Sequence, residues 1–367
     1  MKQLLLQKLN NLKKIIITLS CIISFFCISL LIGFVWYKTN ISPVSKDSQK
    51  IEFTINNGTS TKKVIDDLYE NGLIKNNKAA YIHVKLNKYN LQAGFYELDK
   101  NMSLKEILTK FNKGEVIDNS ITVTFIEGKK ITDFVKTINK SFGYSEEEIL
   151  NTLQDKEYLQ ELIDKYWFLT DDILNDKLYY ALEGYLHPNT YTFKNNATIK
   201  EIIEKLLSST DKILTKYKDS IENSKYTIHE LVTMSSIVEL EGEGSNDRAG
   251  VAGVFYNRLN SGWNLGSDVT AYYGAKLELS EREINMKELA DINGYNTRPA
   301  EMAGKLPIGP ICNPSEESIN ATINPENHNY YYFVADKTKK TYFFTNYDEF
   351  IKKINELKQN GLWYEYN

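Results

Sequence analysis

One glutamate in the second half of the chain falls on the apolar side of a predicted helix, where a charge is costly to bury. Thr227 and Glu230 have the spacing of a capping box, which predicts a helix start at Thr227. At about 100° per residue, Glu239 shares a stripe with Val232 and Ser235. An inward carboxylate must be paired, be protonated, or line a cleft where its proton is used. The pattern therefore offers Glu239 as a general acid.

The predicted end of this helix would help Glu239 to hold a proton. Glycines at positions 242 and 244 indicate that the helix stops within a turn of Glu239, where the negative end of the helix dipole disfavours a carboxylate. By the same periodicity, Glu241 is expected on the solvent side. The alternative is a structural Glu239 in an ion pair with Arg248 or Arg258 of the next helix. The sequence alone leaves both interpretations open.

The composition makes several other kinds of site improbable. The chain has 367 residues, of which 42% are hydrophobic and 25% charged, enough for two or three domains with hydrophobic cores. The formal net charge is -4 and lysines are interspersed with acidic residues rather than clustered, so nucleic acid is not an expected partner. The histidines are scattered, and Thr233 stands where a zinc helix starting at His229 needs its second histidine. With no phosphate-binding, dinucleotide or nucleophile-elbow motif, we predict no metal and no cofactor.

The N-terminal stretch predicts a membrane anchor. Residues 15–37 contain no charge, are long enough to span a bilayer of about 30 Å, and end in the aromatic pair Trp36 and Tyr37. Lysines in residues 1–14 predict a cytoplasmic tail, with everything after Lys38 extracytoplasmic. A cleaved signal peptide is the alternative, but the apolar run is long and lacks a small-residue cleavage site. We therefore expect a single-pass protein with a cytoplasmic N-terminus.

Cysteine usage fits a bacterial plasma membrane better than a eukaryotic secretory route. Cys21 and Cys27 fall inside the predicted span, so Cys312 is the only exported thiol and no disulfide can form within the exported part. No histidine partner for Cys312 is identifiable, which predicts a small buried residue rather than a nucleophile.

Repeated strand and helix patterns predict an α+β fold of several parts. An alternating strand at 51–55, a glycine turn and an amphipathic stretch recur from Val123 onward, with a further strand at 92–98 between them. A hairpin is expected from 330–335 and 341–345. The predicted order is a cytoplasmic tail (1–14), a transmembrane helix (15–37), a linker (38–50), an α+β module (51–118), a second strand and helix unit with connecting helices (119–180), and a mixed α+β domain carrying Glu239 (181–367).

Four segments resemble the endolytic murein transglycosylase family, also called YceG-like. They are Leu182 to Tyr191, Ser236 to Glu241, Val254 to Leu259, and Leu306 to Pro314. That family has a membrane anchor, a LysM-like N-terminal part and a C-terminal catalytic domain in this order, so the resemblance covers nearly the whole chain. Its catalytic residue is the first glutamate of an Ile-Val-Glu-x-Glu motif, which is Glu239 here. The chain departs from the family's usual residues at His187, Gly266 and Tyr342.

The resemblance implies non-hydrolytic cleavage of the β-1,4 bond between N-acetylmuramic acid and N-acetylglucosamine within nascent glycan strands, which would terminate strand elongation. Glu239 would protonate the leaving oxygen and then take a proton from the substrate's own C6 hydroxyl, giving a 1,6-anhydro end. Ordinary glycosidases need two carboxylates, whereas this reaction can use one. The implied partners are peptidoglycan glycan strands, the plasma membrane, and cell-wall synthases such as penicillin-binding proteins. The alternative is a non-catalytic peptidoglycan-binding scaffold that recruits those synthases.

Other residues could contact the sugars. Asp268 and Glu183 could hold sugar hydroxyls or stabilise positive charge at C1, although a loop aspartate is at least as often a capping residue. Tyr191, Tyr295 and Asn296 could stack on or hydrogen-bond to sugars, although any one aromatic residue is more often part of a core. The predicted site consists of Glu239 as the catalytic residue and of Asp268, Glu183, Tyr191, Tyr295 and Asn296 as substrate-binding residues.

Overall fold

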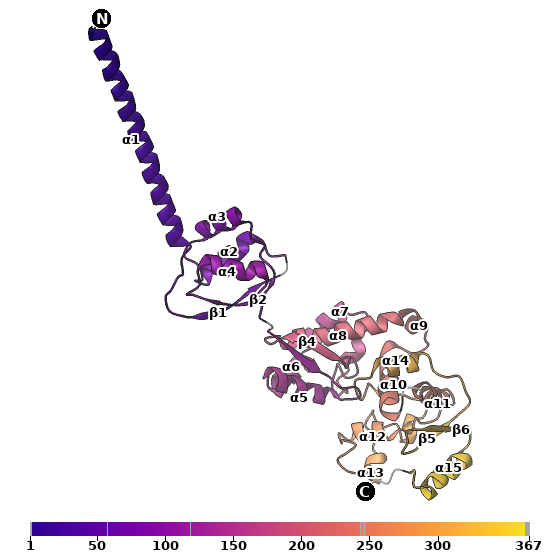
Figure 1. Cartoon of the computed structure of the whole chain (residues 1–367). Helices are drawn as coiled ribbons and strands as arrows, with labels where there is room; N and C mark the ends of the chain where they lie inside the picture. The colour runs from indigo at the N-terminus through magenta and orange to yellow at the C-terminus, as the bar shows by residue number, and fades with distance from the viewer. Residues whose placement is uncertain (1, 57, 118, 243, 245–246, 364–367) are drawn as a thin grey trace. The chain divides into compact units, whose positions relative to one another are not determined.

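The computed structural model describes residues 2–56, 58–117, 119–242, 244 and 247–363. The chain forms two compact units, Met1–Asn119 and Ser120–Asn367. Helices and short antiparallel strand pairs alternate in both units, as Figure 1 shows. The predicted mixed α+β class is confirmed.

The first element is a single long helix, α1 (Lys2–Asn40). Its segment Ile16–Asn40 is long and apolar enough to cross a membrane, and the most apolar stretch is not buried against the rest of the chain. About 20 apolar residues in a helix span the hydrocarbon layer of a bilayer. The helix suggests a single-pass membrane anchor, and its orientation stays a prediction.

A small α+β module follows α1 in the first unit. Its elements are β1 (Lys50–Ile55), α2 (Thr61–Glu70), α3 (Asn77–Asn87), β2 (Gly94–Asp99) and α4 (Leu104–Lys113). The strands pair antiparallel, with Ile51 opposite Leu98, and their inward side chains pack on the helices. The two strands lie where the sequence predicted them, and α4 covers the helix-like pattern of residues 104–111.

The segment between α1 and β1 is held against this module. The backbone N–H of Leu104 donates to the carbonyl of Ile41 at 3.1 Å, and the N–H of Gln49 donates to the carboxylate of Asp99 at 2.8 Å. Residues expected to form a linker therefore contribute hydrogen bonds to the module.

The second unit begins with a related arrangement of elements. Strand β3 (Ser120–Thr124) pairs antiparallel with β4 (Thr190–Lys194), so that Val123 lies opposite Tyr191. Between and after these strands lie α5 (Ile131–Phe142), α6 (Glu146–Gln154), α7 (Lys156–Lys165), η1 (Asp171–Leu174) and α8 (Ile199–Lys216). Residues 182–193 mix turn formers with aromatic residues, which predicts a loop. That prediction is wrong for 190–193, where buried and exposed residues alternate as in a strand.

The rest of the unit is mostly helical. It contains α9 (Lys218–Glu222), α10 (Ile228–Glu241), α11 (Arg248–Asn260), α12 (Asp268–Gly274), α13 (Met286–Leu289), η2 (Ala300–Met302), α14 (Glu316–Ile323), β5 (Tyr332–Ala335), β6 (Thr341–Phe344) and α15 (Tyr347–Gln359). Strands β5 and β6 pair antiparallel, which confirms the predicted hairpin. The capping box at the start of α10 is also confirmed, since Thr227 accepts from the N–H of Glu230 and Glu230 accepts from the N–H of Thr227.

Helix α10 lies between two hydrophobic cores. Leu231 and Val232 belong to a core shared with β3, β4 and α5 to α8, whereas Met234, Ile237 and Val238 belong to a core shared with α11 and α12. Every residue from 231 to 238 is buried. A helix that is covered on all sides has no solvent face, so the predicted split into an apolar and a solvent side is wrong.

Candidate active site

Glu239 lies in the last turn of α10 with its side chain only 5% exposed. The predicted inward direction is confirmed. Its Oε2 atom accepts hydrogen bonds from the backbone N–H of Ser315 at 2.9 Å and from the Ser315 hydroxyl at 2.5 Å. Ser315 is the N-cap of α14, so the carboxylate also faces the positive end of that helix dipole.

An arginine completes the surroundings of the carboxylate. Nη2 of Arg248 lies 3.3 Å from Oε1 of Glu239, while Nη1 of the same side chain donates to Glu317 at 2.8 Å. Of the two ion pairs that the sequence left open, the structure contains the one with Arg248. Arg258 instead donates to the backbone carbonyl of Tyr331 at 2.8 Å. Arg248 thus has a second and closer acidic partner, which can hold the guanidinium if Glu239 changes its contacts.

The loop after β3 lies against Glu239. A Cβ atom on Gly128 would be 3.5 Å from Cγ of Glu239, and the Gly128 N–H donates to the carbonyl of Asn313 at 3.0 Å. The preceding residue, Glu127, has its pKa raised by partial burial and then by the negative charge of Glu239. Sequence reasoning treated this turn as part of a structural repeat and missed Glu127. Only a tertiary contact reveals it.

Glu183 is buried within a network of donors. Its side chain is shielded from solvent, with the whole residue 1% exposed. One oxygen accepts from the N–H of Ile131 at 2.9 Å and from the Asn313 amide at 3.3 Å, and the other accepts from the Tyr273 hydroxyl at 3.0 Å. Burial raises the pKa of Glu183 to about 8, although the Tyr273 hydrogen bond opposes that shift. This carboxyl caps the N-terminus of α5 instead of facing an open groove.

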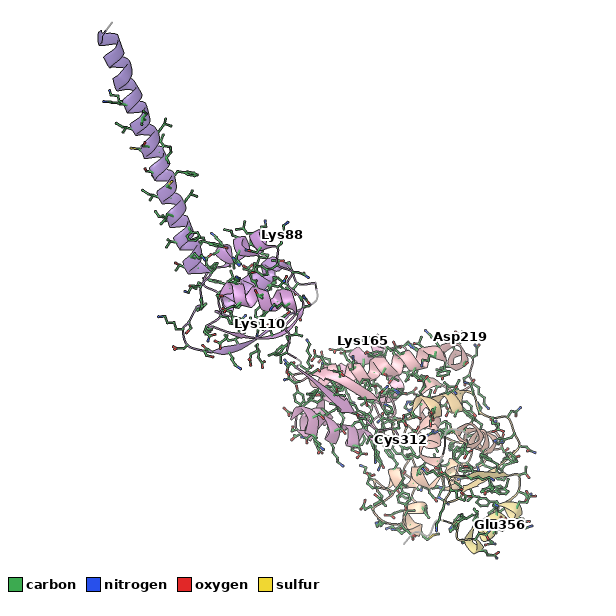
Figure 2. All side chains as sticks on the ribbon, in the orientation of Figure 1. Lys88, Lys110, Lys165, Asp219, Cys312 and Glu356 are labelled. Carbon is green, nitrogen blue, oxygen red and sulfur yellow. The ribbon has the colours of Figure 1, made fainter. Side chains whose placement is uncertain are left out.

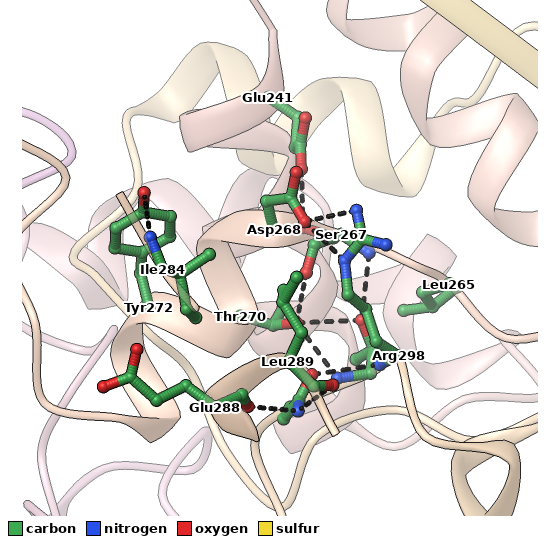
Figure 3. A network of polar contacts seen from close by, with 12 residues as sticks. Glu241, Leu265, Ser267, Asp268, Thr270, Tyr272, Ile284, Glu288, Leu289 and Arg298 are labelled. Carbon is green, nitrogen blue, oxygen red and sulfur yellow. Dashed lines mark hydrogen bonds and ion pairs between the residues drawn. The ribbon is translucent and has the colours of Figure 1, made fainter. Parts of the chain in front are cut away.

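Asp268 and Glu241 belong to a separate polar network, drawn in Figure 3. Asp268 opens α12, is 55% exposed, and forms an ion pair with Arg298. The side chain of Glu241 accepts a hydrogen bond from the Ser267 hydroxyl at 2.6 Å, and burial raises its pKa. The prediction that Glu241 faces solvent is therefore wrong, because the segment 265–270 covers that side of α10.

The three other predicted sugar contacts have their polar groups occupied by the protein. The Tyr191 hydroxyl donates to the His187 carbonyl at 2.7 Å within the first core. The Tyr295 hydroxyl accepts from the backbone N–H of Tyr179 at 3.0 Å. The buried amide of Asn296 donates to backbone carbonyls at the end of α13 and just after it, including that of Leu289 at 3.0 Å. These side chains shape the surrounding loops in the structure.

Cys312 is fully buried, as predicted. Its Sγ atom lies 3.3 Å from the carbonyl of Ser236, and burial raises its pKa well above the usual thiol range. A thiol held in its protonated form is a poor nucleophile. The structure thus supports a packing role for Cys312.

The polar surroundings of Glu239 combine side chains from α10, α11, α14 and the turn after β3. Within the described parts of the chain, none of Asp268, Glu183, Tyr191, Tyr295 and Asn296 makes a hydrogen bond or ion pair with Glu239. A cavity of about 360 Å³ lies beside the first turn of α10, where Leu231, Tyr226 and His328 contribute to its wall, and Glu239 does not line it.

Comparison with known proteins covers almost the whole chain. The model of the YceG-like family matches residues 53–356. This chain belongs to the YceG-like family. The predicted resemblance is confirmed, and the match extends across both structural units.

Relatives of this YceG-like chain carry a consistent name. A Bacillus subtilis protein named endolytic murein transglycosylase is 32% identical over 336 residues, which are 90% of this chain and 91% of that protein. A Streptococcus pneumoniae protein of the same name is 30% identical over 341 residues, 88% of this chain and 61% of its own length. The crystal structure of a YceG-like protein from Listeria monocytogenes matches with a TM-score of 0.59 and 32% identity, covering 84% of this chain and 100% of that one.

Proposed function

We propose that this YceG-like chain is a membrane-anchored endolytic transglycosylase that cleaves the glycan strands of peptidoglycan. The observation that carries the proposal is the 32% identity to the Bacillus subtilis transglycosylase over 90% of this chain and 91% of that protein. Helix α1 supports a single-pass anchor. The lysines that precede its apolar segment support a cytoplasmic N-terminus, with the catalytic unit on the outer side of the bacterial plasma membrane.

In the proposed reaction, Glu239 acts first as an acid and then as a base. Protonated Glu239 donates to the oxygen between C1 of N-acetylmuramic acid and N-acetylglucosamine, and the C1–O bond breaks with its electron pair on that oxygen. The ionised Glu239 then takes the proton of the C6 hydroxyl while the C6 oxygen bonds to C1. The product is a 1,6-anhydro end, no water is consumed, and Glu239 regains its proton.

The contacts of Glu239 suit the second half of this cycle. The Ser315 hydroxyl, the Ser315 N–H and Arg248 all interact favourably with a negative charge, so they stabilise the ionised intermediate state of Glu239. Glu317 gives Arg248 an alternative partner when Glu239 is neutral. These contacts support the role of Glu239 as the base in the second half of the cycle.

Positive charge that develops at C1 needs an acidic neighbour or help from the substrate. The two acids first considered for this role have other partners, since Asp268 pairs with Arg298 and Glu183 is buried. Glu127 directly precedes Gly128, whose Cα lies against the Glu239 side chain, and no ion pair with Glu127 is found among the described residues. Burial and the charge of Glu239 raise the pKa of Glu127, and positive charge at C1 would counter that shift and favour its ionised form. We therefore assign this electrostatic role to Glu127.

The other predicted substrate-binding residues have indirect or peripheral roles in the proposed reaction. Asp268 and Arg298 form an exposed polar pair that could bind sugar hydroxyls, whereas Tyr191, Tyr295 and Asn296 would act by shaping loops. The module from β1 to α4 is proposed to be LysM-like, which its compact strand–helix–helix–strand order supports. Cell-wall synthases are the proposed protein partners. A scaffold without catalysis is the alternative function, favoured only if no cleavage is detected.

Digestion of isolated peptidoglycan tests the assignment. Full-length protein in detergent is incubated with glycan strands, and the products are analysed by mass spectrometry for anhydro-muramyl ends. Glu239→Gln should lower their formation by about 100-fold or more, since general acid–base catalysis contributes that much. Glu230→Gln on the same helix is the matched control, because glutamine can also complete its capping box.

The possible results separate the alternatives. Unchanged product formation by Glu239→Gln would remove Glu239 from the mechanism. Reducing ends in place of anhydro ends would identify a hydrolase that uses water. No product from the unmodified protein would favour the scaffold.

A further inference from the structure

Helix α3 presents an apolar and basic face to solvent. Tyr81, Ile82 and Leu86 are 38%, 45% and 71% exposed. Lys78 and Lys85 lie on the same side of the helix, and both are exposed. The opposite side, with Ala79, Ala80, His83 and Val84, packs into the module. Large apolar side chains at helical spacing on a free face indicate a surface that is covered in the cell.

The charge on α3 and on the segments that flank it in the sequence is of one sign, although Asp66 of α2 accepts a hydrogen bond from Asn77 at the start of α3. Residues 71–96 contain four lysines, at positions 75, 78, 85 and 88, and no aspartate or glutamate, although the whole chain has a net charge of -4. Lys85 lies 4.9 Å from the ring centroid of Tyr81, so the basic and aromatic groups share one surface. A helix with lysines beside exposed apolar residues suits an anionic lipid interface.

Contacts with α1 fix the level of α3 along the anchor. The Tyr37 hydroxyl lies 2.5 Å from Nδ1 of His83, and the two rings are 5.9 Å apart. Lys75, just before α3, donates to the Ser42 hydroxyl at 2.8 Å. Tyr37 belongs to the last turns of the apolar segment Ile16–Asn40, where the hydrocarbon layer gives way to headgroups. Helix α3 is therefore held at the depth of the headgroups.

The figures agree with this placement. In Figure 1, α3 lies on the side of its module from which α1 departs, and β1 lies on the far side. In Figure 2, the side chains of α1 project freely, and the labelled Lys88 lies at the surface just after α3.

We infer that α3 lies in the headgroup layer of the membrane that α1 crosses, with Ile82 and Leu86 against the acyl boundary and the lysines on anionic headgroups. The inference rests on the anchoring role of α1 given under the proposed function. Two attachments, one spanning and one lying in the plane, fix the tilt of the first module against the bilayer. Lipid is the occupant because the contact between Tyr37 and His83 leaves α3 at the membrane surface.

A fluorescence experiment on the full chain tests this contact. The protein is reconstituted into vesicles of equal parts phosphatidylcholine and phosphatidylglycerol, and one accessible cysteine at a time carries an environment-sensitive dye, since Cys312 is fully buried. Leu86→Cys reports on α3 and Thr54→Cys on β1 is the matched exposed control, both with Cys21 and Cys27 replaced by serine. Native Cys27, in a Cys21→Ser protein, reports on the anchor.

The expected result is a blue-shifted emission from the Leu86→Cys probe that lipid-attached nitroxide largely quenches, with little quenching at position 54. Lys78→Glu combined with Lys85→Glu should return the probe to an aqueous environment, whereas Lys62→Glu combined with Lys113→Glu, both exposed, should not.

Each other outcome overturns the inference. An aqueous Leu86→Cys probe with Cys27 in lipid refutes the contact of α3 while the anchor stands. A Cys27 probe in water refutes the anchor and with it this inference, although the activity assay of the proposed function would be unaffected. A Leu86→Cys probe shielded from water but not reached by the lipid quencher would identify a protein surface as the occupant.

Discussion

Replacing Glu183 by glutamine should remove a large pH dependence from the stability of the second unit. The residue is buried, and its pKa is raised from the usual 4.5 to about 8. The folded protein then keeps a proton that the unfolded chain releases. The contribution of this protonated carboxyl to the unfolding free energy is fully present below about pH 4.5 and is lost as the pH rises through about 8. A shift from 4.5 to about 8, at ~1.4 kcal/mol per pH unit, corresponds to a loss of about 5 kcal/mol.

Glutamine reproduces the protonated side chain. Its amide oxygen can accept from the N–H of Ile131 and its amide NH2 can donate to the Tyr273 oxygen, so the substitution keeps the shape and removes the titration. Urea unfolding of the full-length protein in detergent, followed by tryptophan fluorescence over this pH range, measures both proteins. Three of the four tryptophans, Trp167, Trp263 and Trp363, lie in the second unit.

The difference in unfolding free energy between wild type and Glu183→Gln isolates this one group. Wild type should lose stability relative to the variant as the pH rises. Glu148→Gln is the control, because hydrogen bonds from Ser145 lower the pKa of Glu148 and its small effect should have the opposite sign. A difference that stays constant with pH would refute the buried, proton-holding role. If Glu183→Gln folds but lacks transglycosylase activity, the prediction from the sequence that Glu183 binds substrate would be favoured.

Substitutions at three further positions test other parts of the unit. Ser315→Ala removes an N-cap and a hydroxyl donor to Glu239, so urea unfolding should detect a loss of about 1 kcal/mol together with slower anhydro-end formation, whereas Ser315→Gly should cost only a few tenths in stability. Gly184→Ala should lower the melting temperature, because φ is +84° and the new Cβ would lie 2.5 Å from Cβ of Pro310. Burial lowers the pKa of His187 to about 4, so stability should fall as the pH drops from 6.5 towards 4, and His187→Asn should lose that dependence in the same unfolding assay.

The features that the sequence predicted well depend on neighbouring residues. The capping box of Thr227 and Glu230 and the glycine at 242 mark both ends of α10, and the direction of Glu239 follows from the periodicity between them. Arg248 could be named as a partner because it is nine residues from Glu239. The anchor helix could be predicted from an uninterrupted run of apolar residues alone.

The features that were missed depend on distant contacts. Strand β4 is recognised by its pairing with β3. Glu241 is covered by the loop that contains Ser267, which follows α11 in the sequence. Ser315 and Glu127 reach Glu239 only through the packing of α14 and of the turn after β3. One local signal was available for Glu241, since α10 is apolar nearly all round its circumference, and such a helix is usually interior.

The pairing of β3 with β4 makes residues 120–180 indispensable to the part of the protein that follows them. A chain cut at residue 181 would expose the unsatisfied backbone of β4, an edge that promotes aggregation. The same cut would remove side chains that pack against Leu231 and Val232, so α10, which carries Glu239, would lose part of the core that supports it. The shortest active fragment of this polypeptide is therefore expected to start near Ser120, and proteolysis within 120–180 should inactivate it even though Glu239 lies outside that range.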